Sequence, residues 1–317
     1  ASGQAVTLNE SSNNFGTAAI TGANVAITDT NAIILGASTV SGTYTVTAGG
    51  AVTDSGTQEI TGVTTISASG QDVTLNTATN NFAAAVGITG ANVTVVDEDA
   101  IDLGASTVSG TYTVTAGGAV TDSGTQEITG VTTISASGQD VTLNTATNNF
   151  HTTEITGANV AITDTDGIKL GASTVSGTYS VTSGAAITDR GTQEITGVTT
   201  LAASTNKKIQ LDTATNNFAS AVVITSGKNV TLVDEDAIDL GAATVSGTYT
   251  VTAGGDITNS GVLAITSGAT FKVDDGRSIT LNQSNTFSST VTFTPLSGTI
   301  AAVTIKDSDT LDLKALT

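Results

Sequence analysis

The segment from Leu35 to Phe82 recurs without change from Leu103 to Phe150. Diverged copies extend this repetition along the chain with a period of about 67 residues. The copies begin at Ala1, Ala68, Ala136, Ala203 and Asp274. A catalytic pocket is a singular, asymmetric object, whereas near-identical copies present the same side chains and the same surface several times. The repetition therefore favours a fibre-like structural role over catalysis.

Within each repeat, Val, Ile and Leu alternate with Thr, Asn, Ser and Asp, a pattern typical of strands with one buried face. Aligning the phrases that end in Gly gives segments 91–110, 111–130 and 131–157. We interpret them as coils of about 20, 20 and 27 residues with three short strands each. The extra residues of the long coil fall in one place, the loop TATNNF.

These coils predict an all-β fold, a right-handed parallel β-helix or β-solenoid, because parallel crossovers are almost always right-handed. Helix is disfavoured, since the 35 Gly recur every few residues and no 3.6-residue periodicity is sustained. The alternative is an array of β-sandwich domains. No Asn-Gly or Asp-Gly pair joins two long alternating runs, as the hairpins of a sandwich would favour.

We expect one continuous solenoid over 1–317. Its internal repeats are 1–67, 68–135, 136–202, 203–273 and a partial 274–317. Both ends cut through the repeat, so we expect an ordered section of a longer polypeptide or a processed product. No apolar run approaches the roughly 20 residues that a bilayer span requires, and no membrane insertion is expected.

The chain has no Cys and a net charge of −19. Residues 1–168 contain fifteen acidic residues and no Lys or Arg, so all nine cations lie after them. Such a field repels nucleic acid, which is excluded as a partner. Acidic, Thr-rich faces suit an extracellular rod that resists edge-to-edge association.

Two phrases, GTYTVTAGGAVTDSG (42–56) and GGDITNSGVLAITSG (254–268), resemble the coils of filamentous-haemagglutinin-like proteins and other large bacterial β-strand-repeat adhesins. The resemblance covers essentially the whole chain, and its motifs are those of a fold. It implies a secreted or surface-displayed right-handed β-helix, often exported through a dedicated outer-membrane partner. It assigns no functional residue.

An acidic turn is the sharpest local feature and the candidate calcium site, because three carboxylates with nearby carbonyls suit that ion. The strongest copies are Asp97, Glu98, Asp99 and Asp102, and Asp234, Glu235, Asp236 and Asp239. Diluted copies are Asp29, Asp164 with Asp166, and Asp307 with Asp309 and Asp312. The competing interpretation is a solvated acidic ridge that keeps rods apart. The identity of any metal site stays open, and no other cofactor is expected.

Two aromatic sets recur with the repeat. Both are interpreted as core, and the tyrosine hydroxyls then need a partner. The alternative for the Phe set is an exposed stripe that binds glycans or a neighbouring rod. The sets are Phe15, Phe82, Phe150, Phe218 and Phe287, and Tyr44, Tyr112, Tyr179 and Tyr249. His151, the only histidine, is interpreted as drift.

No catalytic residue is assigned and an enzyme is not expected. Polysaccharide-cleaving β-helices are the minor alternative, but they gather Asp, Lys and Arg on irregular coils. Ice binding by stacked Thr-x-Thr rows is a third class. Thr111, Thr113 and Thr115 make one row, whereas Thr132, Thr133 and Ser135 appear out of step with it.

The sequence therefore predicts a structural stalk or fibre segment of an adhesin-like protein, extracellular and on the bacterial cell surface. The alternative is a self-assembling filament or sheath subunit. Expected partners are further copies of the repeat, end to end or laterally, and surface ligands of a host or neighbouring cell.

Overall fold

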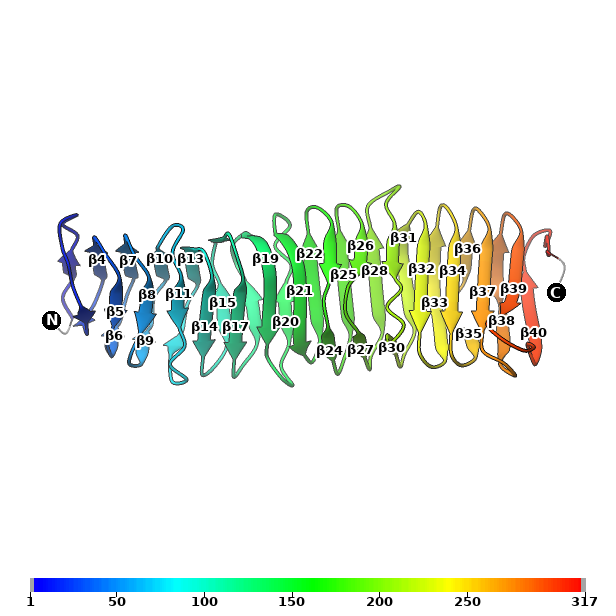
Figure 1. Cartoon of the computed structure of the whole chain (residues 1–317), viewed down its shortest axis with the longest axis horizontal. Coiled ribbons are helices and arrows are strands. Elements are labelled where there is room, and N and C mark those ends of the chain that lie inside the picture. The colour runs from blue at the N-terminus through cyan, green and yellow to red at the C-terminus, as the bar shows by residue number, and fades with distance from the viewer. Residues whose placement is uncertain (1–2, 315–317) are drawn as a thin grey trace. The chain divides into compact units, whose positions relative to one another are not determined.

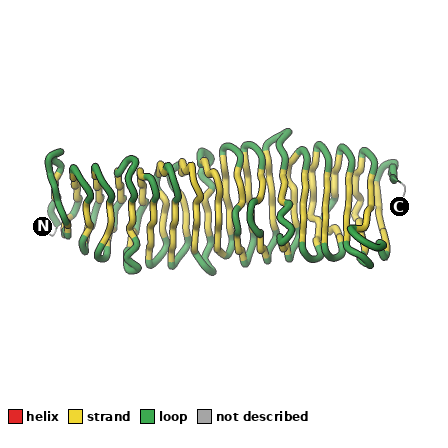
Figure 2. Tube along the Cα trace, viewed as in Figure 1, coloured by secondary structure: helices red, strands yellow, loops and turns green. Residues whose placement is uncertain are grey.

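The computed structural model describes residues 3–314, which form strands and turns without any helix (Figures 1 and 2). No helix long and apolar enough to cross a membrane therefore occurs among these residues. The chain divides into two compact units, Ala1–Ala158 and Asn159–Thr317, and each is described by itself. The single domain predicted over 1–317 stays a prediction.

Short strands account for nearly all the regular structure of the first unit. They are β1 (Val6–Leu8), β2 (Thr17–Ala18), β3 (Thr21–Gly22), β4 (Val25–Asp29), β5 (Ile33–Leu35), β6 (Ser38–Val40), β7 (Tyr44–Ala48), β8 (Val52–Asp54), β9 (Gln58–Ile60), β10 (Thr64–Ser67), β11 (Val73–Leu75), β12 (Asn81–Phe82), β13 (Val86–Gly90), β14 (Val93–Asp97), β15 (Ile101–Leu103), β16 (Ser106–Val108), β17 (Tyr112–Ala116), β18 (Val120–Asp122), β19 (Gln126–Ser135), β20 (Val141–Leu143) and β21 (Asn149–Gly157).

The second unit is built in the same way. Its strands are β22 (Val160–Asp164), β23 (Ile168–Leu170), β24 (Ser173–Val175), β25 (Tyr179–Ser183), β26 (Ile187–Asp189), β27 (Gln193–Ile195), β28 (Thr199–Ala203), β29 (Ile209–Leu211), β30 (Asn217–Phe218), β31 (Val222–Gly227), β32 (Val230–Asp234), β33 (Ile238–Val245), β34 (Tyr249–Ala253), β35 (Ile257–Asn259), β36 (Leu263–Ile265), β37 (Ala269–Val273), β38 (Ser278–Phe287), β39 (Val291–Pro295) and β40 (Ala302–Asp307).

One turn of the solenoid is shown by β14, β15 and β16. The five-residue β14 buries Val93, Val95 and Asp97, which alternate with half-exposed Thr94 and Val96. We call such a strand a long row. The three-residue strands β15 and β16 follow and form a split row on the other side of the turn. Three strands per turn and parallel pairing with the next turn confirm the predicted β-solenoid and exclude the β-sandwich array.

The register of the first unit defines two sides. On side one, strand positions stack in the order Ile33, Val52, Val73, Val93, Tyr112, Thr132 and Thr153. On side two they stack in the order Val6, Val25, Tyr44, Thr64, Val86 and Leu103. The right-handed winding expected from the sequence remains a prediction.

This register corrects the division into coils of 20, 20 and 27 residues. From Val25 through Tyr44 and Thr64 to Val86, turns take 19, 20 and 22 residues, all on side two. Val93, the counterpart of Val25 in the next repeat, pairs with Val73 on side one. One repeat therefore makes about three and a half turns. The 27-residue phrase is one and a half turns, because it holds two long rows and a split row.

The second unit repeats this geometry. Val160, Tyr179, Thr199 and Val222 stack on one side. Val230, the counterpart of Val160, stacks instead on Ile209, which stacks on Ile187. In both units, equivalent residues of successive repeats lie on opposite sides of the solenoid, and a run of successive long rows on one side gives way to split rows where the next repeat begins.

The core is a stack of Val, Ile and Leu side chains that are almost fully buried, with Phe and Tyr at fixed places. The Gly that ends each phrase lies at a corner where adjacent turns approach closely. A Cβ on Gly130 would lie 2.2 Å from the Gly110 carbonyl oxygen. A side chain at this corner would therefore push neighbouring turns apart.

A second backbone requirement lies in the turn ASGQ. Gly70 and Gly138 adopt φ of 71° and 73°, which residues with a Cβ rarely adopt. The diverged fourth copy, which begins at Ala203, has Asn206 here, at φ 67°. Asn is the replacement that such a conformation tolerates best.

Candidate functional site

The acidic turn is built around an inward-pointing carboxylate. Asp97 ends β14 and is only 2% exposed. Its Oδ2 accepts the Phe82 N–H at 2.8 Å, and its Oδ1 accepts the Asp99 N–H at 2.9 Å. The first bond joins two adjacent turns and the second closes the local turn. Asp97 therefore fixes the loop that carries Phe82 onto the following turn.

Burial dominates the electrostatics of this carboxylate. Desolvation raises the pKa of Asp97, the two N–H bonds oppose the rise, and Asp99 and Glu98 add smaller increases. At Asp234, burial outweighs bonds from Phe218 and Asp236 and raises the pKa to about 6. Both pKa values are raised because the fold removes these carboxylates from water, and their hydrogen bonds to N–H groups offset only part of the desolvation.

The other carboxylates of the turn do not converge on Asp97. Glu98 and Asp99 are exposed, and Asp102 lies on β15 after the corner. Within residues 3–314, no three acidic or histidine side chains come close enough to hold a metal ion. In both candidate calcium turns, Asp97–Asp99 and Asp234–Asp236, the first carboxylate is bonded to backbone N–H groups and is turned away from the other two.

In the copies of the acidic turn with fewer carboxylates, the first Asp also accepts backbone N–H groups. Asp29 accepts the N–H groups of Phe15 and Asn31, and Asp164 accepts the Asp166 N–H. Asp307 accepts the N–H groups of Phe287 and Asp309 at 3.4 and 3.2 Å. Asp309 and Asp312 are exposed.

A buried polar network that the sequence did not indicate holds the TATNNF loop. Asn148 is fully buried; its Oδ1 accepts the Gln126 N–H at 2.9 Å and its Nδ2 donates to Asp122 Oδ2 at 2.5 Å. Gln126 Nε2 donates to the carbonyls of Gly104 and Gly124. The same network recurs at Asp54, Gln58 and Asn80, and at Asp189, Gln193 and Asn216.

The aromatic residues fill the core, as the sequence predicted. Phe82, Phe150, Phe218 and Phe287 are about 1% exposed, and Phe15 is half-buried. Phe82 stacks on Ile60 and Phe150 on Ile128, so these two lie on opposite sides. The exposed binding stripe considered from the sequence does not form.

The four tyrosines are also buried, but their hydroxyls make no hydrogen bond of normal geometry. Burial raises the pKa of Tyr44 to about 12, and the nearby Ser38 hydroxyl opposes the rise. At Tyr249 burial alone raises the pKa, because Ala243 occupies the place of that serine. These tyrosine side chains are 0–1% exposed, so their hydroxyls are shielded from solvent.

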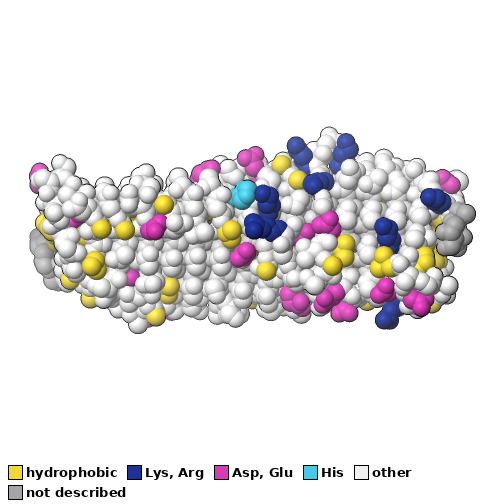
Figure 3. Space-filling model, in the orientation of Figure 1, with side chains coloured by type: hydrophobic (Ala, Val, Ile, Leu, Met, Phe, Trp, Pro, Cys, Tyr) yellow, Lys and Arg dark blue, Asp and Glu magenta, His cyan; other side chains and the backbone are white. Residues whose placement is uncertain are grey.

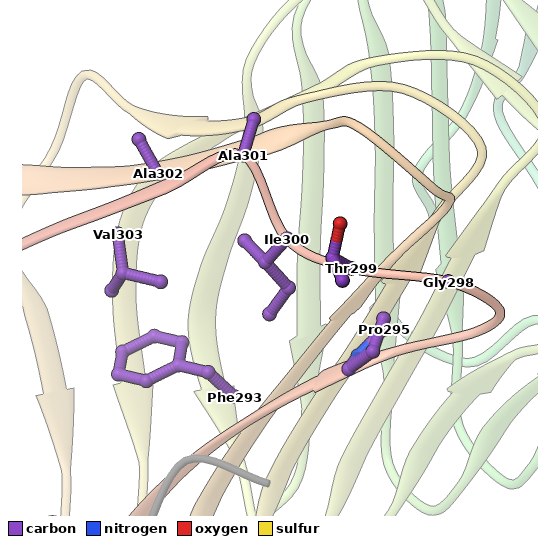
Figure 4. Close-up of a pocket in the computed structure, with 8 residues that line it drawn as sticks. All are labelled: Phe293, Pro295, Gly298, Thr299, Ile300, Ala301, Ala302 and Val303. Atoms are coloured by element: carbon purple, nitrogen blue, oxygen red, sulfur yellow. The ribbon is translucent and has the colours of Figure 1, made fainter.

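Two pockets lie on the second unit. A pocket of about 430 Å³ is lined by Phe293, Pro295, Ile300 and Val303 with the backbone of their turn (Figure 4). A second, of about 210 Å³, lies at Thr205, Ser226 and Thr244. Neither lining contains an acidic or basic side chain. His151 is exposed on β21, and the expectation that the chain is not an enzyme stays a prediction.

The threonine rows differ from the sequence prediction. Thr133 lies in register with Thr113, and Ser135 with Thr115, whereas Thr132 points into the core. The misalignment used to argue against an ice-binding face is therefore wrong. It came from equating Thr132 with an outward position.

Comparisons with known proteins agree with this repetition. A family model described as repeats of unknown function, DUF5649, matches residues 22–89, 90–156, 157–225 and 227–294. These four segments have the period read from the sequence, with a different starting point. No curated protein and no solved structure gives a significant match to the chain.

Proposed function

Because the chain belongs to the DUF5649 family of repeats, which has no assigned function, we propose that it acts as a structural element. Specifically, we propose a stalk or fibre segment of a secreted or cell-surface bacterial protein of the filamentous-haemagglutinin-like adhesin type. Its work is to span distance and display neighbouring parts of a longer polypeptide.

One observation carries this proposal: in each unit, buried Asp, Gln and Asn side chains hydrogen-bond one turn to the next. Asp97 binds the backbone of the preceding turn, and Gln126 and Asn148 tie three successive turns together. Every such bond resists shear between turns, as a stack under tension requires. In a nearest-neighbour array of this kind, every added repeat also adds interface stability.

The proposal is tested by locating and pulling the protein. Antibodies against the chain should label intact cells of the source bacterium, and surface labelling should disappear after mild external proteolysis. Stretching single molecules between their ends should give unfolding in discrete steps above thermal forces. Labelling confined to permeabilised cells, or a chain that extends as a soft coil, would contradict the proposal.

A self-assembling filament or sheath is the second candidate. One feature favours it, namely the scarcity of charge on the outward positions of the long rows.

A further inference from the structure

The outward side chains of the long rows are almost free of charge. In the first unit the sole exception is Glu154. On side two the outward residues are Ala26, Thr28, Thr45, Thr47, Thr65, Ser67, Gly87 and Thr89. On side one they are Thr94, Val96, Thr113, Thr115, Thr133, Ser135, Glu154 and Thr156. We call each set of four long rows a threonine face.

This neutrality is notable in a chain of net charge −19. The charges of the first unit lie instead on split rows, as Glu59, Asp102 and Glu127 do, or on turns, as Glu98 and Asp99 do. In the second unit the faces carry one cation, Lys272 on β37. Figure 3 shows broad stretches of neutral side chains between the coloured charges.

The faces are also regular. Thr94, Thr113 and Thr133 form a column, and Thr115 and Ser135 stand beside it. Within a column, successive side chains are separated by the strand spacing of about 4.8 Å. Neighbouring columns lie about 6.7 Å apart along the strand. A surface with the same spacing is another threonine face, so two such faces can interdigitate their methyl and hydroxyl groups row by row.

We propose that copies of this chain associate side by side through their threonine faces, and that the association is open-ended. The half-turn between repeats is the reason. The first unit already presents one face on side two and the next on side one, so each copy has a contact surface on both flanks. A contact that repeats on opposite flanks generates a layer and not a closed dimer.

Salt dependence follows from where the charges lie. The acidic turns of neighbouring copies repel each other, and salt screens this repulsion. Salt has little effect on the attraction between two neutral faces, because that attraction does not depend on charge. Association should therefore strengthen as salt rises. Docking through ion pairs, for example between Lys207, Lys208 or Lys228 and acidic turns, would weaken instead. This inference rests on the proposed structural role and adds to it the partner and the contact surface.

The test is sedimentation velocity of the whole chain at low and high NaCl, with electron microscopy of the high-salt samples. We expect monomers at low salt, and larger species with parallel striations at high salt. A face variant carries Thr47→Glu, Thr115→Glu, Thr182→Glu and Thr252→Glu, one per repeat on a long row. A control carries Thr53→Glu, Thr121→Glu, Thr188→Glu and Thr258→Glu, the same charge on split rows that are separated from each threonine face by another split row.

The face variant should weaken association at least about tenfold, because like charges opposed at an interface cost several kcal/mol. The control should associate like the parent chain at high salt. Circular dichroism melts show whether both variants keep the fold. Equal loss in both variants, or monomers at every salt concentration, would overturn the proposal. Monomers that inhibit ice recrystallisation would also overturn it and assign the faces to a water lattice. A monomeric chain that still resists stretching would leave the stalk function standing.

Discussion

Two spin labels can measure the half-turn between repeats directly. The chain has no Cys, so Thr47→Cys with Thr115→Cys places labels at equivalent positions of the first two matched repeats. Both positions are exposed. A reference chain carries Thr47→Cys with Thr107→Cys, which lie in one column through Ser67 and Thr89.

The structure sets both distances. The reference pair is three rungs apart on one side, about 14 Å at a strand spacing of about 4.8 Å. The equivalent pair is three and a half rungs apart on opposite sides. With about 17 Å along the axis and about 10 Å between the two sheets, its backbone separation is at least about 20 Å. The labels point away from each other in that pair, which lengthens the measured distance further.

Dipolar electron paramagnetic resonance should therefore give clearly different distances for the two chains, although their labels are separated by similar lengths of sequence. Each single-label chain provides the background. If the Thr47 and Thr115 labels lie as close as the reference pair, a repeat holds three whole turns and equivalent residues share a side. The proposed two-flank association would then lose its basis.

Three further predictions concern stability. Asn148→Ala leaves the buried Gln126 N–H without its acceptor and should lower the free energy of unfolding by about 1–3 kcal/mol; Asn80→Ala should cost a similar amount, and no loss in urea titrations would show that water replaces the amide. Burial raises the pKa of Asp234 from its ordinary value of 3.8 to about 6, so the folded state binds the proton more tightly than the unfolded state does. Stability should rise as pH falls from 7 through 6 towards 4, and Asp234→Asn should reduce that rise in thermal melts; a parent and variant with equal pH profiles would refute this assignment. Phe150→Ala should cost about 3–5 kcal/mol because the ring is fully buried, and half-buried Phe15→Ala should cost less; the reverse order would place the Phe150 ring outside the core.

The fold class could be predicted from the sequence. Alternation of Val, Ile and Leu with polar residues places Val93 and Val95 inward and Thr94 outward, and the structure does the same. The Gly that end the phrases marked the repeating unit in the sequence, and in the structure Gly110 and Gly130 stack at a corner. These features are local, since each depends on a few neighbouring residues and a two-residue period.

The polar interior was not predicted, because polar residues in a strand pattern are assigned outward by default. Asp97 was grouped with Glu98 and Asp99 as one acidic cluster. It lies an even number of residues from buried Val93 and Val95 along β14, so it has the same parity and faces the same side of the strand. Gln126 has the same parity as Ile128. Strict attention to parity would have indicated that both point inward and need hydrogen-bond partners from adjacent turns.

The number of turns per repeat could not be read from periodicity alone. A duplicated segment need not contain a whole number of turns, since a solenoid requires only that each new row fits on the row beneath it. Here β14, a long row, stacks on split row β11, and β15 with β16, a split row, stacks on long row β13. Both junctions pack well because a long strand and a split pair of strands each point every second side chain into the core. Copying a unit of three and a half turns therefore preserves the inward pattern of the core and reverses only the side that each copied surface faces.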